Sequence, residues 1–346
     1  MHVKHDNLGP FTSPEGEVLD AHDGNMLEVD GTYYLYAMGY TDCKLETGLI
    51  PPRDCPGIYR KFGSGCGFRT DHAFNIYTST DLSSWTIAEP TLASAGLPLE
   101  TRREGIYFRP KVVWNELTQL YVLWINYLPP DRTPLKAYPK ATYLVGTSES
   151  PLGPFELLDT EPNLKYEGAG DLTIAVDEAT GNAYVAYDAW SNSHTLSVEL
   201  LDPTFTFSTQ ENSGLLSPSS HEAPLLFKRL GVWYLMFGHT CCFCRTGSGL
   251  AVFTAESPLG PWKDEKLDIN PRKSWSMDME IPAQANYVFE VNGAFIYTGD
   301  LWTTAEDGLK SHDAQYWGLL SFEGRSVEGV PLPKVLEFSD KFEMEV

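Results

Sequence analysis

The 346-residue chain has no continuous apolar stretch of the roughly 18 to 20 residues that a membrane-spanning helix needs. Its first residues, Met1 to Asp6, lack the apolar segment of a secretory signal peptide. We therefore expect no membrane partner. The cellular location stays open, secreted or extracytoplasmic if a signal peptide has been removed. The absence of any Asn-x-Ser/Thr acceptor argues weakly against a glycosylated secreted protein.

Basic residues are scarce. The chain has 25 lysines and arginines against 47 aspartates and glutamates, which gives a formal net charge of −22. Such a surface repels the phosphate backbone of nucleic acids and anionic lipid headgroups. We therefore exclude nucleic acid as a partner and expect a neutral or cationic small partner.

Only six cysteines are present, and they fall into two groups of three, Cys43, Cys55 and Cys66, and then Cys241, Cys242 and Cys244. Because each group is odd, complete disulfide pairing requires a bridge between the groups. The second group follows His239 and could instead hold zinc, but two facing Cys-x-x-Cys pairs are missing. We favour disulfides or free thiols and predict neither a metal nor a cofactor.

What the chain does have is a repeated pattern of strands. An apolar strand, a short Gly, Asn or Asp turn and an aromatic-rich strand recur five times, at residues 25–36, 111–124, 172–187, 223–237 and 284–297. More polar strand pairs follow, at 75–85, 145–155 and 251–262. The pattern predicts an all-β, monomeric five-bladed β-propeller of four-stranded antiparallel blades, one domain over 1–346 with a Cys-rich insertion at about 40–74. A two-sheet sandwich would explain the strands but not the repeat.

The first strand of each propeller blade lines the central channel, and the loops that lead into these strands converge on one face. The residues at the five strand starts are Asp23, Arg109, Asp171, Glu222 and Gln284. Three are carboxylates from separate blades, which favours a catalytic site over scattered surface charge. Glu222 stands before a long apolar run, where partial burial would raise its pKa toward use as a general acid. The alternatives are a solvated glutamate, a turn role for Asp23 and a strand cap for Asp171.

Further side chains near the strand starts have the chemistry that binds sugars. Flat apolar faces stack on sugar rings, and polar groups bind the hydroxyls. The stacking candidates are Tyr107, Phe108, Trp190 and Trp302, and the hydroxyl-binding candidates are Arg109, Asp300 and Gln284. His239 could reach a substrate, a metal or the neighbouring cysteines. Most of the nine tryptophans are expected in the core.

Several short segments spread in order along nearly the whole chain are similar to one known family. They are Ala21-His-Asp-Gly24, Arg109-Pro-Lys-Val112, Gly170-Asp-Leu-Thr173, Glu222-Ala-Pro224 with Phe227-Lys-Arg229, Ala283-Gln284, Tyr297-Thr-Gly-Asp-Leu-Trp302 and Gln315-Tyr-Trp317. The sequence resembles glycoside hydrolase family 43, and within it the branch of exo-β-1,3-galactanases.

The resemblance implies an inverting glycosidase acting on an oligo- or polysaccharide. Glu222 takes the position of the general acid, and Asp171 that of the carboxylate that orients the acid and raises its pKa. Asp23 takes the position of the base in the wider family, whereas the galactanase branch lacks this aspartate and holds the water with the equivalent of Gln284. Phe108 replaces a substrate-binding glutamate of that branch. Arabinofuranosidase, xylosidase or galactofuranosidase activity stays open, as does a non-catalytic sugar-binding propeller.

Overall fold

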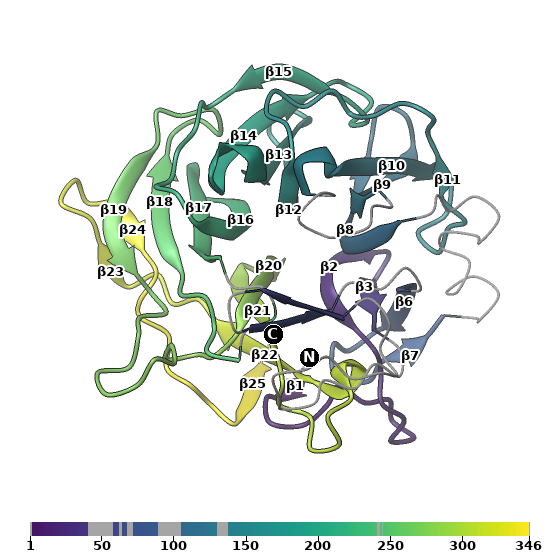
Figure 1. Ribbon diagram of the computed structural model, residues 1–346, viewed down its shortest axis with the longest axis vertical. Helices are drawn as coiled ribbons and strands as arrows, with labels where there is room; N and C mark the ends of the chain where they lie inside the picture. Colours follow the sequence, from purple (N-terminus) through teal and green to yellow (C-terminus); the bar gives the residue numbers. More distant parts are fainter. Residues whose placement is uncertain are drawn as a thin grey trace.

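The computed structural model is a ring of five antiparallel sheets around a central channel, a five-bladed β-propeller (Figure 1). It describes residues 2–40, 58–61, 64–67, 72–88, 105–129, 138–240, 243 and 245–345, with the backbone alone for 58–61 and 64–67. The predicted fold class is thus confirmed. The six cysteine side chains and most of the insertion predicted at about 40–74 lie outside the described residues.

Each blade is a meander whose first strand lies at the channel. Blade I contains β2 (His22–Val29), β3 (Thr32–Gly39), β6 (Ala73–Ser79) and β7 (Thr86–Ile87). Blade II contains β8 (Ile106–Asn115), β9 (Leu120–Leu128), β10 (Thr142–Ser148) and β11 (Glu156–Leu157). Blade III contains β12 (Ala169–Asp177), β13 (Asn182–Ala189), β14 (Thr195–Leu201) and β15 (Ser208–Asn212). Blade IV contains β16 (His221–Arg229), β17 (Val232–His239), β18 (Ala251–Ala255) and β19 (Lys263–Asp268), and blade V contains β20 (Gln284–Val291), β21 (Ala294–Leu301) and β22 (Ala314–Leu319).

The remaining elements are short. Three strand pairs lie outside the blades, β1 (His2–Asp6) with β25 (Lys341–Glu345), β4 (Ile58–Lys61) with β5 (Ser64–Gly67), and β23 (Gly324–Arg325) with β24 (Pro331–Leu332). The described 3₁₀ helices are η1 (Tyr138–Lys140), η2 (Trp190–Asn192) and η3 (Lys310–His312). Within the described ranges, no helix has the length and apolar character needed to span a membrane.

Tight turns join the inner strand to the second strand in three blades. The two turn residues have positive φ in each case: 50° and 78° at Asp30-Gly31, 49° and 84° at Leu230-Gly231, and 48° and 81° at Asn292-Gly293. This is the conformation of type I′ turns, whose twist matches that of the flanking strands. The turns therefore fix the register of these inner hairpins.

The core consists of layers of aromatic and aliphatic side chains packed between neighbouring blades. Trp85, Trp124, Trp233, Trp302 and Trp317 are all essentially inaccessible to solvent. A buried indole N–H group usually has a hydrogen-bond partner, and Trp124 Nε1 donates to the carbonyl of Phe205 at 2.7 Å. The expectation that most tryptophans are structural thus holds for at least these five.

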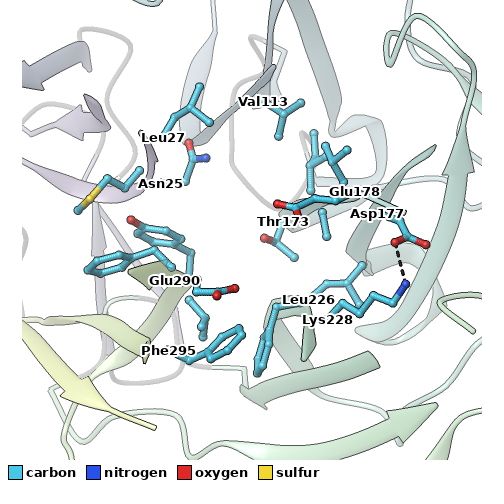
Figure 2. A pocket seen from close by; sticks show the side chains of 18 of the residues that line it. Asn25, Leu27, Val113, Thr173, Asp177, Glu178, Leu226, Lys228, Glu290 and Phe295 are labelled. Atoms are coloured by element: carbon cyan, nitrogen blue, oxygen red, sulfur yellow. Dashed lines mark hydrogen bonds and ion pairs between the residues drawn. The ribbon is translucent and has the colours of Figure 1, made fainter. Parts of the chain in front are cut away.

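The inner strands also enclose a cavity of about 670 Å³ in the channel (Figure 2). Each of the five inner strands contributes to its lining, for example with Asn25, Val113, Thr173, Leu226 and Glu290. These residues all come later in their strands than the five starts named above. The cavity therefore lies toward the opposite end of the channel from the candidate site.

The N-terminal segment closes the ring against blade V. The Asn7 side chain donates to the Trp317 carbonyl at 3.1 Å and accepts from the Trp317 amide at 2.8 Å, so it acts as a strand partner for β22. Pro10 adds an antiparallel bridge to Ala314. The chain ends meet beside this blade because β1 pairs with β25 (Figure 1).

Replacing Asn7 with alanine is expected to lower the free energy of unfolding by about 1 to 3 kcal/mol, because it leaves buried backbone groups of Trp317 unpaired. Urea denaturation measures the change. Asn182→Ala, at the exposed first residue of β13, is the matched control and should stay within about 0.5 kcal/mol of the parent. An equal effect of both substitutions would contradict this role of Asn7.

Candidate active site

Every inner strand begins with an irregularity in its pairing to the second strand. The register shifts lie between His22 and Asn25, Phe108 and Lys111, Ala169 and Leu172, Glu222 and Leu225, and Ala285 and Tyr287. A bulge bends a strand and redirects its side chains. The positive φ of Asp23 (60°), Arg109 (47°) and Ala223 (54°) lies at these bulges. Five equivalent bulges therefore bring the predicted catalytic side chains to one end of the channel.

Arg109 joins two of the predicted carboxylates. Its Nε lies 2.8 Å from Asp171 Oδ1, and its Nη2 lies 3.6 Å from Asp23 Oδ1. The third nitrogen, Nη1, donates to the Ala285 carbonyl at 2.8 Å. Blades I, II, III and V are thereby connected through one buried guanidinium, which was predicted to bind substrate hydroxyls.

The two carboxylates differ in their pKa. Burial alone would raise the pKa of Asp23, but Arg109 and the hydrogen bond that the Tyr40 hydroxyl donates to Oδ2 hold it below its usual value. Burial raises the pKa of Asp171, and the negative charge of Asp23 adds to this effect against the opposing effect of Arg109. Within the described part of the chain, Asp171 Oδ2 has no hydrogen-bond partner, so only Asp23 has both the cation and a hydroxyl donor.

The backbone around Asp23 is held by buried polar groups. Asp300 Oδ2 accepts from the Asp23 amide at 2.9 Å, and Asp300 Oδ1 lies 3.1 Å from His22 Nδ1. Lys111 Nζ donates to the carbonyls of Asp23 and Gly24 at 3.0 and 2.7 Å. Burial, together with the nearby Arg109, lowers the pKa of Lys111 to about 7. These contacts keep the left-handed bulge at Asp23 in place.

On the other side of the site, Glu222, Gln284 and Trp302 form a chain of hydrogen bonds. Trp302 Nε1 donates to Gln284 Oε1 at 2.9 Å, and Gln284 Nε2 donates to Glu222 Oε1 at 2.9 Å. An indole N–H can only donate, so the Gln284 amide must turn its nitrogen toward Glu222. One amide N–H of Gln284 is then left for a further acceptor. Glu222 itself is buried, with 8% of its surface exposed.

Asp188 and His194 lie beside Glu222. His194 Nδ1 and Asp188 Oδ2 are 2.7 Å apart, and ligand atoms of Asp188, His194 and Glu222 lie within 4.8 Å of one another. Among the residues that the structure describes, these three side chains could surround a metal ion. Gly170 makes room for it, since a Cβ there would lie 2.6 Å from Asp188 Oδ2. The positive charge that His194 can carry also acts on Asp171, so this histidine lies among three carboxylates.

The remaining predicted sugar-binding residues lie in different environments. Tyr107, Phe108, Asp300 and Trp302 are buried, with at most 9% of their surface exposed. Tyr107 packs on Tyr127, with 5.5 Å between the ring centroids. Trp190 opens η2 and is partly exposed, and the exposed His239 ends β17 against His221, with 4.7 Å between their rings. Burial and His221 lower the pKa of His239.

The model of the family "Glycosyl hydrolases family 43" matches residues 17–284, which is most of the chain and contains Asp23, Arg109, Asp171, Glu222 and Gln284. The chain belongs to glycoside hydrolase family 43. It is therefore a glycoside hydrolase, and its substrate is a carbohydrate. No curated protein matches the sequence.

Solved structures of family 43 enzymes share this fold. An exo-β-1,3-galactanase from Phanerochaete chrysosporium is 20% identical with a TM-score of 0.71, covering 99% of this chain and 69% of its own. One from Clostridium thermocellum is 20% identical with a TM-score of 0.69 and coverages of 98% and 66%. A family 43 β-1,3-galactosidase with galactodeoxynojirimycin is 21% identical with a TM-score of 0.71 and coverages of 97% and 99%.

The sequence-based prediction missed several side chains of this family 43 site. Tyr40, Lys111, Asp188, His194 and Lys310 contact the predicted residues or act on their charge. Lys111 carries a visible signal, because it lies two residues after Arg109 in a strand that is otherwise apolar. The other four lie at strand ends or in loops, where the strand pattern gives no indication of which blade they face.

Replacing Arg109 with methionine is expected to lower the free energy of unfolding by about 3 to 5 kcal/mol at pH 7, because two buried carboxylates lose their counter-charge. The pKa of Asp23 is depressed in the folded parent, so its ionised form stabilises the parent above the usual pKa of about 3.9, and this contribution is lost as the pH falls. The difference between parent and variant should therefore shrink toward acid pH.

Urea denaturation between about pH 2.5 and 7 measures this difference, because the contribution of Asp23 is lost only below its usual pKa. Arg272→Met, which removes an exposed arginine, is the control and should change stability by less than about 0.5 kcal/mol. A loss for Arg109→Met that does not vary with pH would show that packing, rather than charge, is what the guanidinium supplies.

Proposed function

We propose that this family 43 enzyme is an inverting glycosidase that acts from chain ends on β-1,3-linked galactan or arabinogalactan side chains. Two groups of side chains at one end of the channel support this mechanism. In the first, Gln284 donates a hydrogen bond to Glu222, and in the second, Arg109 lies close to both Asp23 and Asp171. The substrate is supported by the exo-β-1,3-galactanases among the similar structures.

Glu222 is the general acid in this proposal. Gln284 donates to Oε1 and so orients the carboxyl group of Glu222, which carries the acidic proton. From there the proton passes to the glycosidic oxygen as the bond to the anomeric carbon breaks. Arg109 interacts electrostatically with Glu222, Asp171 and Asp23, so all three carboxylates respond to one cation. Asp171 is the modulating group, because a nearby negative charge favours the protonated acid.

Two side chains, Asp23 and Gln284, are available to handle the attacking water. Inversion requires the water on the face of the sugar opposite the acid, and an acid and a base carboxyl group are then roughly 6.5 to 9.5 Å apart. Asp23 is held ionised by Arg109 and Tyr40, which suits a carboxylate base. Gln284 keeps one N–H group that could orient the water. We assign Asp23 as the base and keep water positioning by Gln284 as the alternative.

Substrate specificity depends on the surroundings of Phe108. Its ring packs against His72, with 5.3 Å between centroids, and against Phe243 at 6.2 Å. A phenyl group cannot accept a hydrogen bond from a sugar hydroxyl as a glutamate can. This difference from the galactanase branch keeps other exo-glycosidase activities, on arabinofuranosyl, xylosyl or galactofuranosyl groups, as the second candidate. Trp190, His239, Tyr107, Trp302 and Asp300 remain the further proposed contributors to sugar binding.

Replacing Glu222 with glutamine is expected to reduce kcat on β-1,3-galactan by about 10²- to 10⁴-fold, as loss of general acid catalysis does. The loss should be much smaller on a dinitrophenyl β-galactoside, whose leaving group departs without a proton. Glu290→Gln, at the far cavity, is the matched control and should keep parental kcat on both. An equal loss on both substrates would contradict the acid role.

Replacing Asp23 with asparagine is expected to reduce kcat equally on both substrates, because water activation is needed whatever the leaving group. Proton NMR of the first product formed by the parent should show the α-anomer of galactose. If Asp23→Asn keeps its rate and Gln284→Ala loses it, the water is held by Gln284 instead. A β-anomer as first product would contradict inversion.

A further inference from the structure

Lys310 is a buried lysine that the proposed reaction does not use. It begins η3, in the loop between β21 and β22, and only 1% of its surface is exposed. Its Nζ has no hydrogen-bond partner within the described part of the chain. An unpaired buried ammonium is unfavourable unless other groups compensate for its lost hydration. The surroundings of Lys310 supply this compensation in a specific form.

Three aromatic rings enclose the ammonium. Nζ lies 3.1 Å from the ring centroid of Trp302, 3.6 Å from that of Phe243 and 4.2 Å from that of Tyr40. We call these three rings the cage. Aromatic faces attract cations electrostatically, most strongly where water is excluded. The cage therefore favours the charged form of Lys310, while burial lowers its pKa to about 7.

Two rings of the cage are direct partners of the proposed water-handling groups. The Tyr40 hydroxyl donates to Asp23 Oδ2, and Trp302 Nε1 donates to Gln284 Oε1 at 2.9 Å. The ammonium thus lies against the rings of the two side chains that orient Asp23 and Gln284. Asp313 joins the Lys310 backbone to the loop after β21, because its amide donates to the Lys310 carbonyl at 3.2 Å and its Oδ1 accepts from the amides of Thr304 and Ala305 at 2.9 and 3.0 Å.

The charged and titratable groups that act on Lys310 are mostly acidic. They come from the segment before β2, from β2 itself, from β21 and from the end of η3, with the Tyr40 phenol and the His22 imidazole also facing it: Asp20, His22, Asp23, Tyr40, Asp300 and Asp313. The positive charge of Lys310 is one of the effects that lower the pKa of Asp23, after those of Arg109 and Tyr40. Lys310 therefore acts on Asp23 both through its charge and through the Tyr40 ring.

We propose that Lys310 is a positioning residue for the water-handling half of the site, where its caged ammonium keeps Asp23 ionised and holds Tyr40 and Trp302 in their hydrogen bonds to Asp23 and Gln284. The consequence for catalysis rests on the proposed roles of Asp23 and Gln284. The effect on the charge of Asp23 does not, and it is measured separately.

The test is the titration of the Asp23 carboxyl, followed by NMR in protein labelled with ¹³C at aspartate carboxyls and assigned with Asp23→Asn. Lys310→Met removes the charge and keeps a long apolar side chain, whereas Lys310→Arg keeps the charge. Lys228→Met, at the ion pair with Asp177, is the matched control. We expect the pKa of Asp23 to rise in Lys310→Met, to stay close to the parent in Lys310→Arg, and to be unchanged in Lys228→Met.

The pH dependence of the activity should shift in the same direction as the pKa of Asp23. The acidic limb of the kcat/KM profile of Lys310→Met moves to higher pH, so its fold-loss relative to the parent is larger at acid pH than at neutral pH. A folded Lys310→Met with an unaltered Asp23 titration would overturn the inference. If Asp23→Asn keeps full activity, the base assignment fails, while the NMR titration still decides the role of Lys310.

A measurement on the parent serves if Lys310→Met does not fold. The Cε resonance of Lys310 should be strongly shifted by the three ring currents and should titrate near pH 7. The Asp23 carboxyl signal is expected to show a second inflection at the same midpoint. Titration of Lys310 without any response at Asp23 would overturn the inference.

Discussion

The β-bulge at the start of each inner strand is the constraint on which the site depends. Regular strands alternate their side chains between the two faces of a blade, so none would extend from the blade edge into the channel. Asp23, Arg109 and Asp171 lie within the bulges of their strands, and Glu222 and Gln284 lie just before the bulges of theirs, all toward one channel end. Because all five blades carry this irregularity, the same repeat that builds the propeller also places the residues of the site.

Bringing carboxylates together in a chain with a net charge of −22 requires local cations. Arg109, Lys111 and Lys310 supply them, and each is almost completely buried. They differ in their partners: Arg109 binds carboxylates, Lys111 binds backbone carbonyls and Lys310 lies among aromatic rings. These unequal environments lower the pKa of Asp23 and raise that of Asp171. Carboxylates with such different pKa values can take different roles in one site.

The sequence was sufficient to predict the propeller and the five strand starts, because both follow from local patterns: an apolar strand, a tight turn and a polar residue before the strand. It was insufficient for the environment of each side chain. Trp302 has its ring buried in the cage and orients Gln284 with its indole N–H, contacts that its proposed role in stacking on sugar did not anticipate. Asp300, proposed to bind hydroxyls, also holds His22 and the Asp23 amide. Contacts between blades decide these roles, and strand periodicity carries no information about them.

The site consists of two hydrogen-bonded halves that Arg109 and the cage of Lys310 connect. Blades I to III provide the carboxylates joined by Arg109, and blades IV and V provide Glu222, Gln284 and Trp302. Phe108 belongs to neither hydrogen-bonded group, although it lies on an inner strand beside Arg109. A change at this position also reaches the cage, because the Phe108 ring packs against Phe243, which encloses Lys310.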